Sequence, residues 1–321
     1  ILFPVLVDYP EEKFGGFLAI TDYRDPVIHE EIEANGWLIW PPIRYSYRTV
    51  NNEIPEAAPA KPSWLYDRET RCQRYPMGVD DPSCTIGNWN WLGTDDQGRD
   101  VFSTILYGMR ISLFVGVAAV AFAMVLGITL GLISGYVGGW VETIIMRVAD
   151  VQLTFPSILV AMLIFGIAKG ITPVEYRDQM AIWVLILAIG LSDWVQFARV
   201  VRGATLVEKN KEYVQAARLI GRKPGAIMLR HILPNVLSPV LVIATISLAL
   251  AIIAEATLSF LGVGAPPTQP SLGTLIRIGQ GFLFSGEWWI LFFPACTLLA
   301  LALSVNLLGD WLRDALNPRL R

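Results

Sequence analysis

Few side chains in this 321-residue sequence have the type and spacing that catalysis requires. One of its two histidines, His29, precedes two glutamates but lacks the second histidine of a zinc-protease helix, and His231 lies among basic residues. No Gly-x-x-x-x-Gly-Lys-Ser/Thr sequence occurs, so the chain has no P-loop for nucleotide phosphates. We therefore predict no catalytic residue, no metal site and no bound cofactor. Any energy for its work must come from an ion gradient or from a partner.

The three cysteines favour structural roles. Cys296 lies in an apolar run and is expected to be a small buried side chain. Cys72 and Cys84 are 12 residues apart in a stretch rich in proline, glycine and aspartate, without a neighbouring histidine or cysteine to complete a zinc set. They form either a disulfide or two free thiols, and a location outside the cytoplasm favours the disulfide.

Two carboxyl groups lie within long apolar runs. Asp193 is near the middle of its run and Glu255 toward the end of another. A charge at mid-bilayer costs about 2.5–3.5 kcal/mol on insertion scales, so such groups usually face protein or water. Each is therefore a candidate either for pairing with a neighbouring helix or for lining a transport pathway. Arg147 and Asp150 are expected to pair locally.

The composition shows which elements must position these groups. Hydrophobic residues make up 54% of the chain and charged residues only 17%, with a mean hydropathy of +0.49. Charged residues average near 25% in soluble domains, which excludes a soluble enzyme. Because about 20 apolar residues cross the hydrocarbon core, we predict an all-α polytopic membrane protein. Its five expected transmembrane helices are 110–135, 141–168, 180–203, 235–262 and 288–312.

The charge distribution predicts the orientation. Residues 1–100 carry 9 Lys and Arg against 17 Asp and Glu, whereas residues 199–230 contain eight Lys and Arg. Positive charge concentrates in cytoplasmic loops, so 204–233 and the C-terminus should be cytoplasmic. Residues 1–105 and the loop 263–287 should then be periplasmic, and a sixth helix preceding the chain would translocate this front segment. We divide the chain into a loop-rich periplasmic segment of turns and short strands, 1–105, and a transmembrane domain, 106–321.

The cytoplasmic loop 204–233, here named the coupling loop, is the most informative stretch. It contains two short helical segments separated by Gly221, which is expected to end the first helix as its C-cap. A solvated basic loop would satisfy the positive-inside rule alone. However, Ala216 and Ala217 are small residues where an exposed helix would favour Lys or Glu. Small residues allow close approach of another surface, so a helix–glycine–helix suits docking into a partner.

This loop resembles the "EAA" motif of ABC-importer permeases at Gln215-Ala216-Ala217, Gly221 and Leu233-Pro234, departing at Gln215, where the family usually has Glu. Three further stretches are similar to the second permease subunit of oligopeptide/dipeptide/nickel importers: Leu92–Phe102, Gly135–Gly139 and Glu255–Gly264. The front, at Asp22–Pro26 and Asn35–Arg44, resembles the long periplasmic loop of the Yej-type microcin C and oligopeptide importer. The similarity covers about residues 90–321 beyond that front.

The resemblance implies a type I ABC-importer permease fold in the bacterial inner membrane. It also implies a second homologous permease as heterodimer partner, ABC ATPase subunits or a fused double ATPase that bind ATP and magnesium, and a periplasmic peptide-binding protein. Besides these partners the chain contacts membrane lipid, and no basic patch indicates nucleic-acid binding. The expected ATPase-coupling interface comprises Tyr213, Gln215, Ala216, Ala217, Arg218, Gly221, Arg222 and Pro234.

Two other classes of function fit the sequence less well. An ion-coupled secondary transporter of small solutes would require inverted repeats and a mid-membrane site, and only Asp193 points in that direction. An intramembrane hydrolase would require a nucleophile paired with a base, which the two histidines do not provide. The sequence therefore favours a peptide-importing permease subunit.

Overall fold

The computed structural model describes residues 10–14, 21, 23, 26–37, 39, 45–50, 58–65 and 90–315. Its internal contacts divide the chain into two units, 1–44 and 45–321. The first unit contains the 3-10 turn η1 (Glu11–Phe14) and the helix α1 (Pro26–Asn35). The side of the membrane on which residues 1–105 lie stays a prediction.

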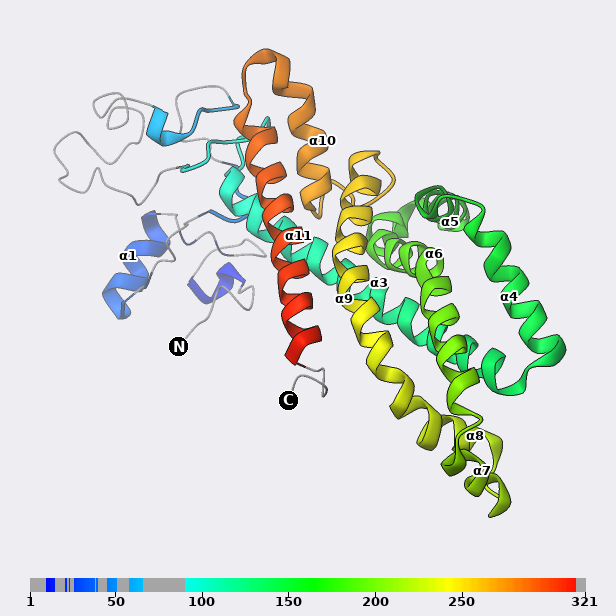
Figure 1. Ribbon diagram of the computed structural model, residues 1–321. Coiled ribbons are helices and arrows are strands. Elements are labelled where there is room, and N and C mark those ends of the chain that lie inside the picture. Colours follow the sequence, from blue (N-terminus) through cyan, green and yellow to red (C-terminus); the bar gives the residue numbers. More distant parts are fainter. Residues whose placement is uncertain are drawn as a thin grey trace. The chain divides into compact units, whose positions relative to one another are not determined.

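The second unit is helical throughout its described core. In chain order its elements are η2 (Ser63–Leu65), α3 (Val101–Val137), α4 (Gly139–Leu153), α5 (Ser157–Ile171), η3 (Val174–Tyr176), α6 (Arg177–Glu208), α7 (Glu212–Leu219), α8 (Pro224–Ile227), η4 (Met228–Ile232), α9 (Leu233–Phe260), α10 (Leu272–Phe282), η5 (Leu283–Ser285) and α11 (Trp289–Ala315). Figure 1 shows α7 and α8 at one end of α6 and α9, and α10 toward the opposite end of α9.

Four continuous helical stretches, built on α3, α6, α9 and α11, are long and apolar enough to cross a membrane. The expected all-α polytopic fold is confirmed. The fifth expected span, 141–168, is not one helix: α4 and α5 meet at an angle of 98°, and only the pair together completes five spans. Pro156 explains the break, because it disfavours helical geometry at the preceding Phe155.

The α3–α6 interface depends on three glycines of α3 spaced four residues apart, Gly127, Gly131 and Gly135. A Cβ atom at Gly127 would lie 2.4 Å from Phe197 Cβ, and one at Gly131 would lie 2.6 Å from the carbonyl oxygen of Ala198. Transmembrane helices use such small-residue stripes to bring their backbones together. The hydropathy of α3 indicates a span; the glycine stripe determines which side of it meets α6.

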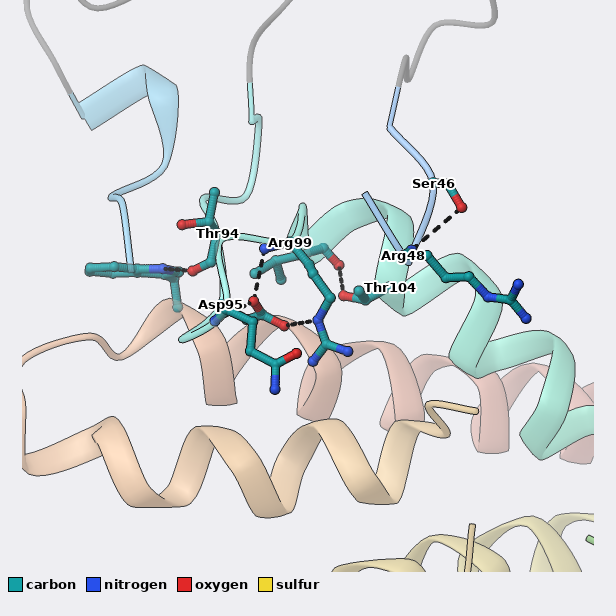
Figure 2. A network of polar contacts seen from close by, with 9 residues as sticks. Ser46, Arg48, Thr94, Asp95, Arg99 and Thr104 are labelled. Carbon is teal, nitrogen blue, oxygen red and sulfur yellow. Dashed lines mark hydrogen bonds and ion pairs between the residues drawn. The ribbon is translucent and has the colours of Figure 1, made fainter. Parts of the chain in front are cut away.

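The segment that leads into α3 is fixed by polar contacts (Figure 2). Asp95 accepts hydrogen bonds from the backbone of Gln97 and Arg99, both at 2.9 Å, and forms an ion pair with Arg99 Nε at 2.7 Å. Asp100 then caps α3 by accepting a hydrogen bond from Ser103 N at 2.7 Å. Burial raises the pKa of Asp100 to about 7, with a smaller contribution from the nearby Asp95 charge. This end of α3 is therefore held by structure outside the span.

Two loop regions contain helix that was not predicted from the sequence. The described part of 1–105 has the expected turns, together with 3-10 turns, α1 and isolated bridges such as Val50 with Arg99. The expected loop 263–287 contains the helix α10, which begins directly after the proline-rich run and is capped by Ser271, whose hydroxyl accepts from Thr274 N at 3.2 Å. A serine N-cap supplies the start signal that the prolines obscured.

Candidate functional site

The coupling loop folds as two short helices around a glycine turn. Helix α7 ends at Leu219, and Gly221 follows with φ +79°. The amide of Gly221 donates to Arg218 O at 3.0 Å and that of Arg222 to Ala217 O at 3.1 Å. This pair of bonds is the Schellman arrangement, in which a glycine tolerates the left-handed conformation that ends a helix. The predicted C-cap role of Gly221 is confirmed.

One face of α7 packs on the chain itself. Val214 is fully buried and Ala217 is 6% exposed, within the core cluster that also contains Ile227 and Ile232. Ala217 therefore faces the interior, and the expectation that it lies at a partner surface is wrong. Its small size lets α7 lie close to α8 and η4. Only Ala216 of the pair is exposed.

The opposite face of the loop is open. Gln215, Ala216, Arg218, Arg222 and Pro234 are all exposed. Sequence reasoning missed the most prominent pair, Leu219 and Ile220, which are 89% and 79% exposed at the tip of the loop. The sequence did contain a signal for their exposure. Both residues directly precede the glycine turn, and a turn at the tip of a projecting loop leaves the side chains beside it exposed. The tip thus combines two exposed apolar side chains with flanking positive charge.

A set of polar contacts ties α7 to the neighbouring spans. Tyr213 donates a hydrogen bond to Glu208 at the end of α6 and accepts one from Asn235 Nδ2 of α9 at 3.1 Å. Burial, together with the hydrogen bond and charge of Glu208, raises the pKa of Tyr213 to about 12. Lys211 forms an ion pair with the same Glu208 at 2.6 Å. Tyr213 therefore links the end of α6 with the start of α9.

Two cations connect the loop to the end of α3. The Arg218 guanidinium lies 5.1 Å from the centroid of the Tyr136 ring, within the range of a cation–π interaction. Lys209 Nζ donates to Gly135 O at 2.8 Å. Gln215, the position where the family usually has Glu, donates to Asn210 O at 3.0 Å. The loop is consequently anchored to α3, α6 and α9 at once.

The intramembrane charges are distributed differently from the expectation. Asp150 pairs with Arg199 at 2.6 Å, so the expected local pairing of Arg147 with Asp150 is wrong. Within the described residues Asp193 is half-buried and has neither an ion pair nor a hydrogen bond. Glu255 is fully buried and bonds to Ser259. The structure does not bring Asp193 and Glu255 together with the coupling loop.

The cysteine expectations have two outcomes. Cys296 is exposed on α11 and free, contrary to the expected burial, because an apolar helix at a membrane need not face inward. Cys72 and Cys84 lie outside the described residues, so their disulfide stays a prediction. No cluster of potential metal ligands occurs among the residues that the structure describes.

Comparison with known proteins identifies the family. The family described as "Binding-protein-dependent transport system inner membrane component" matches residues 127–321. The chain belongs to this family. It is therefore a multi-pass inner-membrane subunit of a transport system, and the family description names a binding protein as part of such systems.

The relatives extend the similarity over the whole chain. The peptidoglycan transport system permease protein YejE of Agrobacterium fabrum is 44% identical over 99% of this chain and 81% of its own length. The oligopeptide transport system permease protein OppC of Bacillus subtilis is 40% identical over 72% of both chains. Among solved structures, the inward-facing MetNI methionine ABC transporter matches with a TM-score of 0.53 and 19% identity, over 67% of this chain and 96% of that chain. This last likeness supports the type I permease fold.

Proposed function

We propose that this chain is the permease subunit of an ATP-driven peptide importer, and that its coupling loop receives the movement of an ABC ATPase. The single observation that carries the proposal is the coupling loop itself: an exposed apolar tip on a two-helix unit that is anchored to three spans. A solvated connector has no need of exposed leucine and isoleucine, or of ties to α3, α6 and α9.

The geometry supports transmission of force. Leu219 and Ile220 at the tip suit insertion into an apolar cleft, because burying each side chain contributes about 1.5–3 kcal/mol. The basic side chains beside them, Arg218 and Arg222, suit an acidic rim. Because Tyr213 bonds to α6 and α9 together, displacement of the tip moves the ends of both spans.

The substrate class follows from the relatives. Their names assign them to the transport of peptidoglycan, oligopeptides, dipeptides and glutathione. Amide-linked amino acids are common to these compounds, so we propose import of oligopeptides, with microcin C-like peptides included in the class. A periplasmic peptide-binding protein would deliver them, and selectivity would lie largely in that protein.

The remaining partners are also proposals. A second homologous permease would complete the pathway as a heterodimer, and two ATPase subunits or a fused double ATPase would bind ATP and magnesium. The broad apolar outer surfaces of α3, α6, α9 and α11 would contact lipid and the second permease. This chain would supply half of the pathway and no hydrolytic residue.

The experiment changes the exposed tip. In Leu219→Ser/Ile220→Ser, the ATPase should dissociate about 10- to 100-fold more readily, because at least one buried apolar side chain is lost from the contact. Copurification with the ATPase and ATP-dependent uptake of a labelled peptide into vesicles are measured together. Leu283→Ser, which changes a 40% exposed leucine on η5 at the opposite end, is the control and should retain both.

Two results would contradict the proposal. Normal ATPase association and uptake in the double variant would make the loop a solvated connector. Uptake that follows an imposed ion gradient without ATP would instead support the secondary-transporter alternative.

A further inference from the structure

A buried polar cluster lies where the end of α9 meets α3 and the start of α10. Its centre is Glu255 of α9, which has no exposed surface. Three serines surround the carboxyl group: Ser112 from α3, Ser259 from the last turn of α9, and Ser271, the N-cap of α10. All three are at most 1% exposed, so water does not reach the group from the surface of the chain.

The hydrogen bonds of this cluster connect three elements. Glu255 Oε1 accepts from Ser259 Oγ at 2.7 Å, and Ser259 Oγ accepts from Ala265 N at 3.1 Å, which fixes the loop after α9. Ser112 Oγ accepts from Leu272 N at 3.3 Å, so a side chain of α3 satisfies one of the free amides at the start of α10. Each serine that accepts an amide in this way still has its hydroxyl proton to donate.

The second carboxyl oxygen of Glu255, Oε2, is the acceptor toward which the serine hydroxyl protons can turn. Glu255 Oε2 is buried and has no hydrogen-bond partner at normal geometry, which is costly for a carboxyl oxygen. The hydroxyls of Ser112 and Ser271 are its nearest available donors. A small rotation of either would connect the carboxyl group, through a hydroxyl, to the amides at the N-terminus of α10, where negative charge is favoured.

The backbones at this junction leave no free space. A Cβ atom at Gly273 of α10 would lie 2.2 Å from the carbonyl oxygen of Ala256, next to Glu255 on α9. A Cβ atom at Gly108 of α3 would lie 3.2 Å from Leu272 N. The start of α10 is thus pressed against both helices, beside the Glu255 carboxyl group.

We propose that Glu255 is a positioning residue that fastens α10 to α9 and α3, so that movement of α9 at the coupling loop is carried to α10 at the opposite end. This inference rests on the proposed function. Helix α9 has 28 residues, about 42 Å of helix at 1.5 Å per residue, and runs from the coupling loop to this cluster. The polar cluster converts the end of that helix and the start of α10 into one unit.

The test measures the exposure of α10 in membranes that contain the assembled complex. A cysteine replaces Leu275, which is 4% exposed on α10, in a background in which Cys72, Cys84 and Cys296 are replaced by serine, and its reaction with an impermeant maleimide is followed. Adding Glu255→Ala should raise its labelling rate about five- to hundredfold, the range expected when a buried hydrogen-bonded group is lost. Glu255→Gln, which keeps the acceptor for Ser259, should raise it less.

A second cysteine distinguishes local release from general loosening. Ala198 is fully buried on α6, away from the cluster, and a cysteine there should stay unreactive in every Glu255 variant. Equal increases at both positions, or no increase at Leu275→Cys, would overturn the proposal.

The functional arm uses the same complex. Glu255→Ala should keep ATPase association and basal ATP hydrolysis but lose stimulation by the peptide-loaded binding protein. Retained stimulation would overturn the transmission role even if labelling rises. Failure of the proposed function can be told apart from failure of the positioning role of Glu255. If the coupling loop does not bind the ATPase, the Leu219→Ser/Ile220→Ser complex remains intact, but the labelling result at α10 does not change.

Discussion

The close approach of α3 and α6 at Gly127 makes a substitution by alanine measurable. The added Cβ would lie 2.4 Å from Phe197 Cβ and 2.7 Å from the carbonyl oxygen of Trp194. Carbon atoms in contact normally lie about 3.5–4.0 Å apart, so the helices must separate by roughly 1 Å. Overpacking of this kind costs about 1–3 kcal/mol, and the better helix propensity of alanine offsets at most about 1 kcal/mol. The expected net loss is about 1–2 kcal/mol.

The assay is thermal unfolding of the detergent-solubilised complex at a fixed scan rate. Gly127→Ala should lower the midpoint by a few degrees, since about 1 kcal/mol corresponds to roughly 2–4 °C for 150–250 residues and to less for a longer chain. Gly203→Ala in α6 is the matched control. A Cβ atom there meets nothing within 4 Å, so the same exchange should leave the midpoint unchanged or raise it.

A double variant makes the reasoning stricter. In Gly127→Ala/Gly131→Ala the same separation of α3 from α6 makes room for both new methyl groups. The double variant should therefore lose less stability than the sum of the losses in the two single variants. An unchanged midpoint in Gly127→Ala, or an equal decrease in Gly203→Ala, would refute the steric account.

Three further outcomes follow from other contacts. Burial raises the pKa of Asp100 to about 7, so the contribution of Asp100 to stability is full below about pH 4 and is lost as the pH rises through 7. Asp100→Asn keeps an N-cap acceptor and should flatten the pH dependence of the thermal midpoint over this window. Gln152 bonds to two carbonyls of α6 and accepts from Trp194 Nε1, so Gln152→Leu should cost about 1–3 kcal/mol and shift the tryptophan fluorescence of the complex, and an unchanged spectrum would contradict this. In intact spheroplasts an impermeant thiol reagent should label a single cysteine at Trp64, which is 53% exposed, but not one at Lys209, and labelling of the latter would reverse the predicted topology.

The sequence predicted those features that depend on local chemistry. The length of the apolar runs located the spans, because about 20 apolar residues cross the hydrocarbon core irrespective of how the helices pack. Gly221 identified the end of α7, since a left-handed residue after a helix is a local requirement. The break between α4 and α5 was equally local, at Pro156, but the unbroken hydropathy of 141–168 concealed it. Hydropathy measures the environment of a segment and says nothing of its backbone continuity.

The features that the sequence did not predict depend on which face of a helix is turned inward. In a soluble protein apolar residues mark the buried face, but lipid is as apolar as leucine, so Cys296 on α11 could not be placed by hydrophobicity. Small size and polarity carry that information in a membrane. The glycine stripe of α3 faces α6, and Glu255 faces the serines of α3 and α10, because only protein can accommodate close backbones or satisfy a carboxyl group there. Glycine and buried oxygen atoms therefore identify interior faces in this chain, whereas leucine and isoleucine occur on both interior and outward faces.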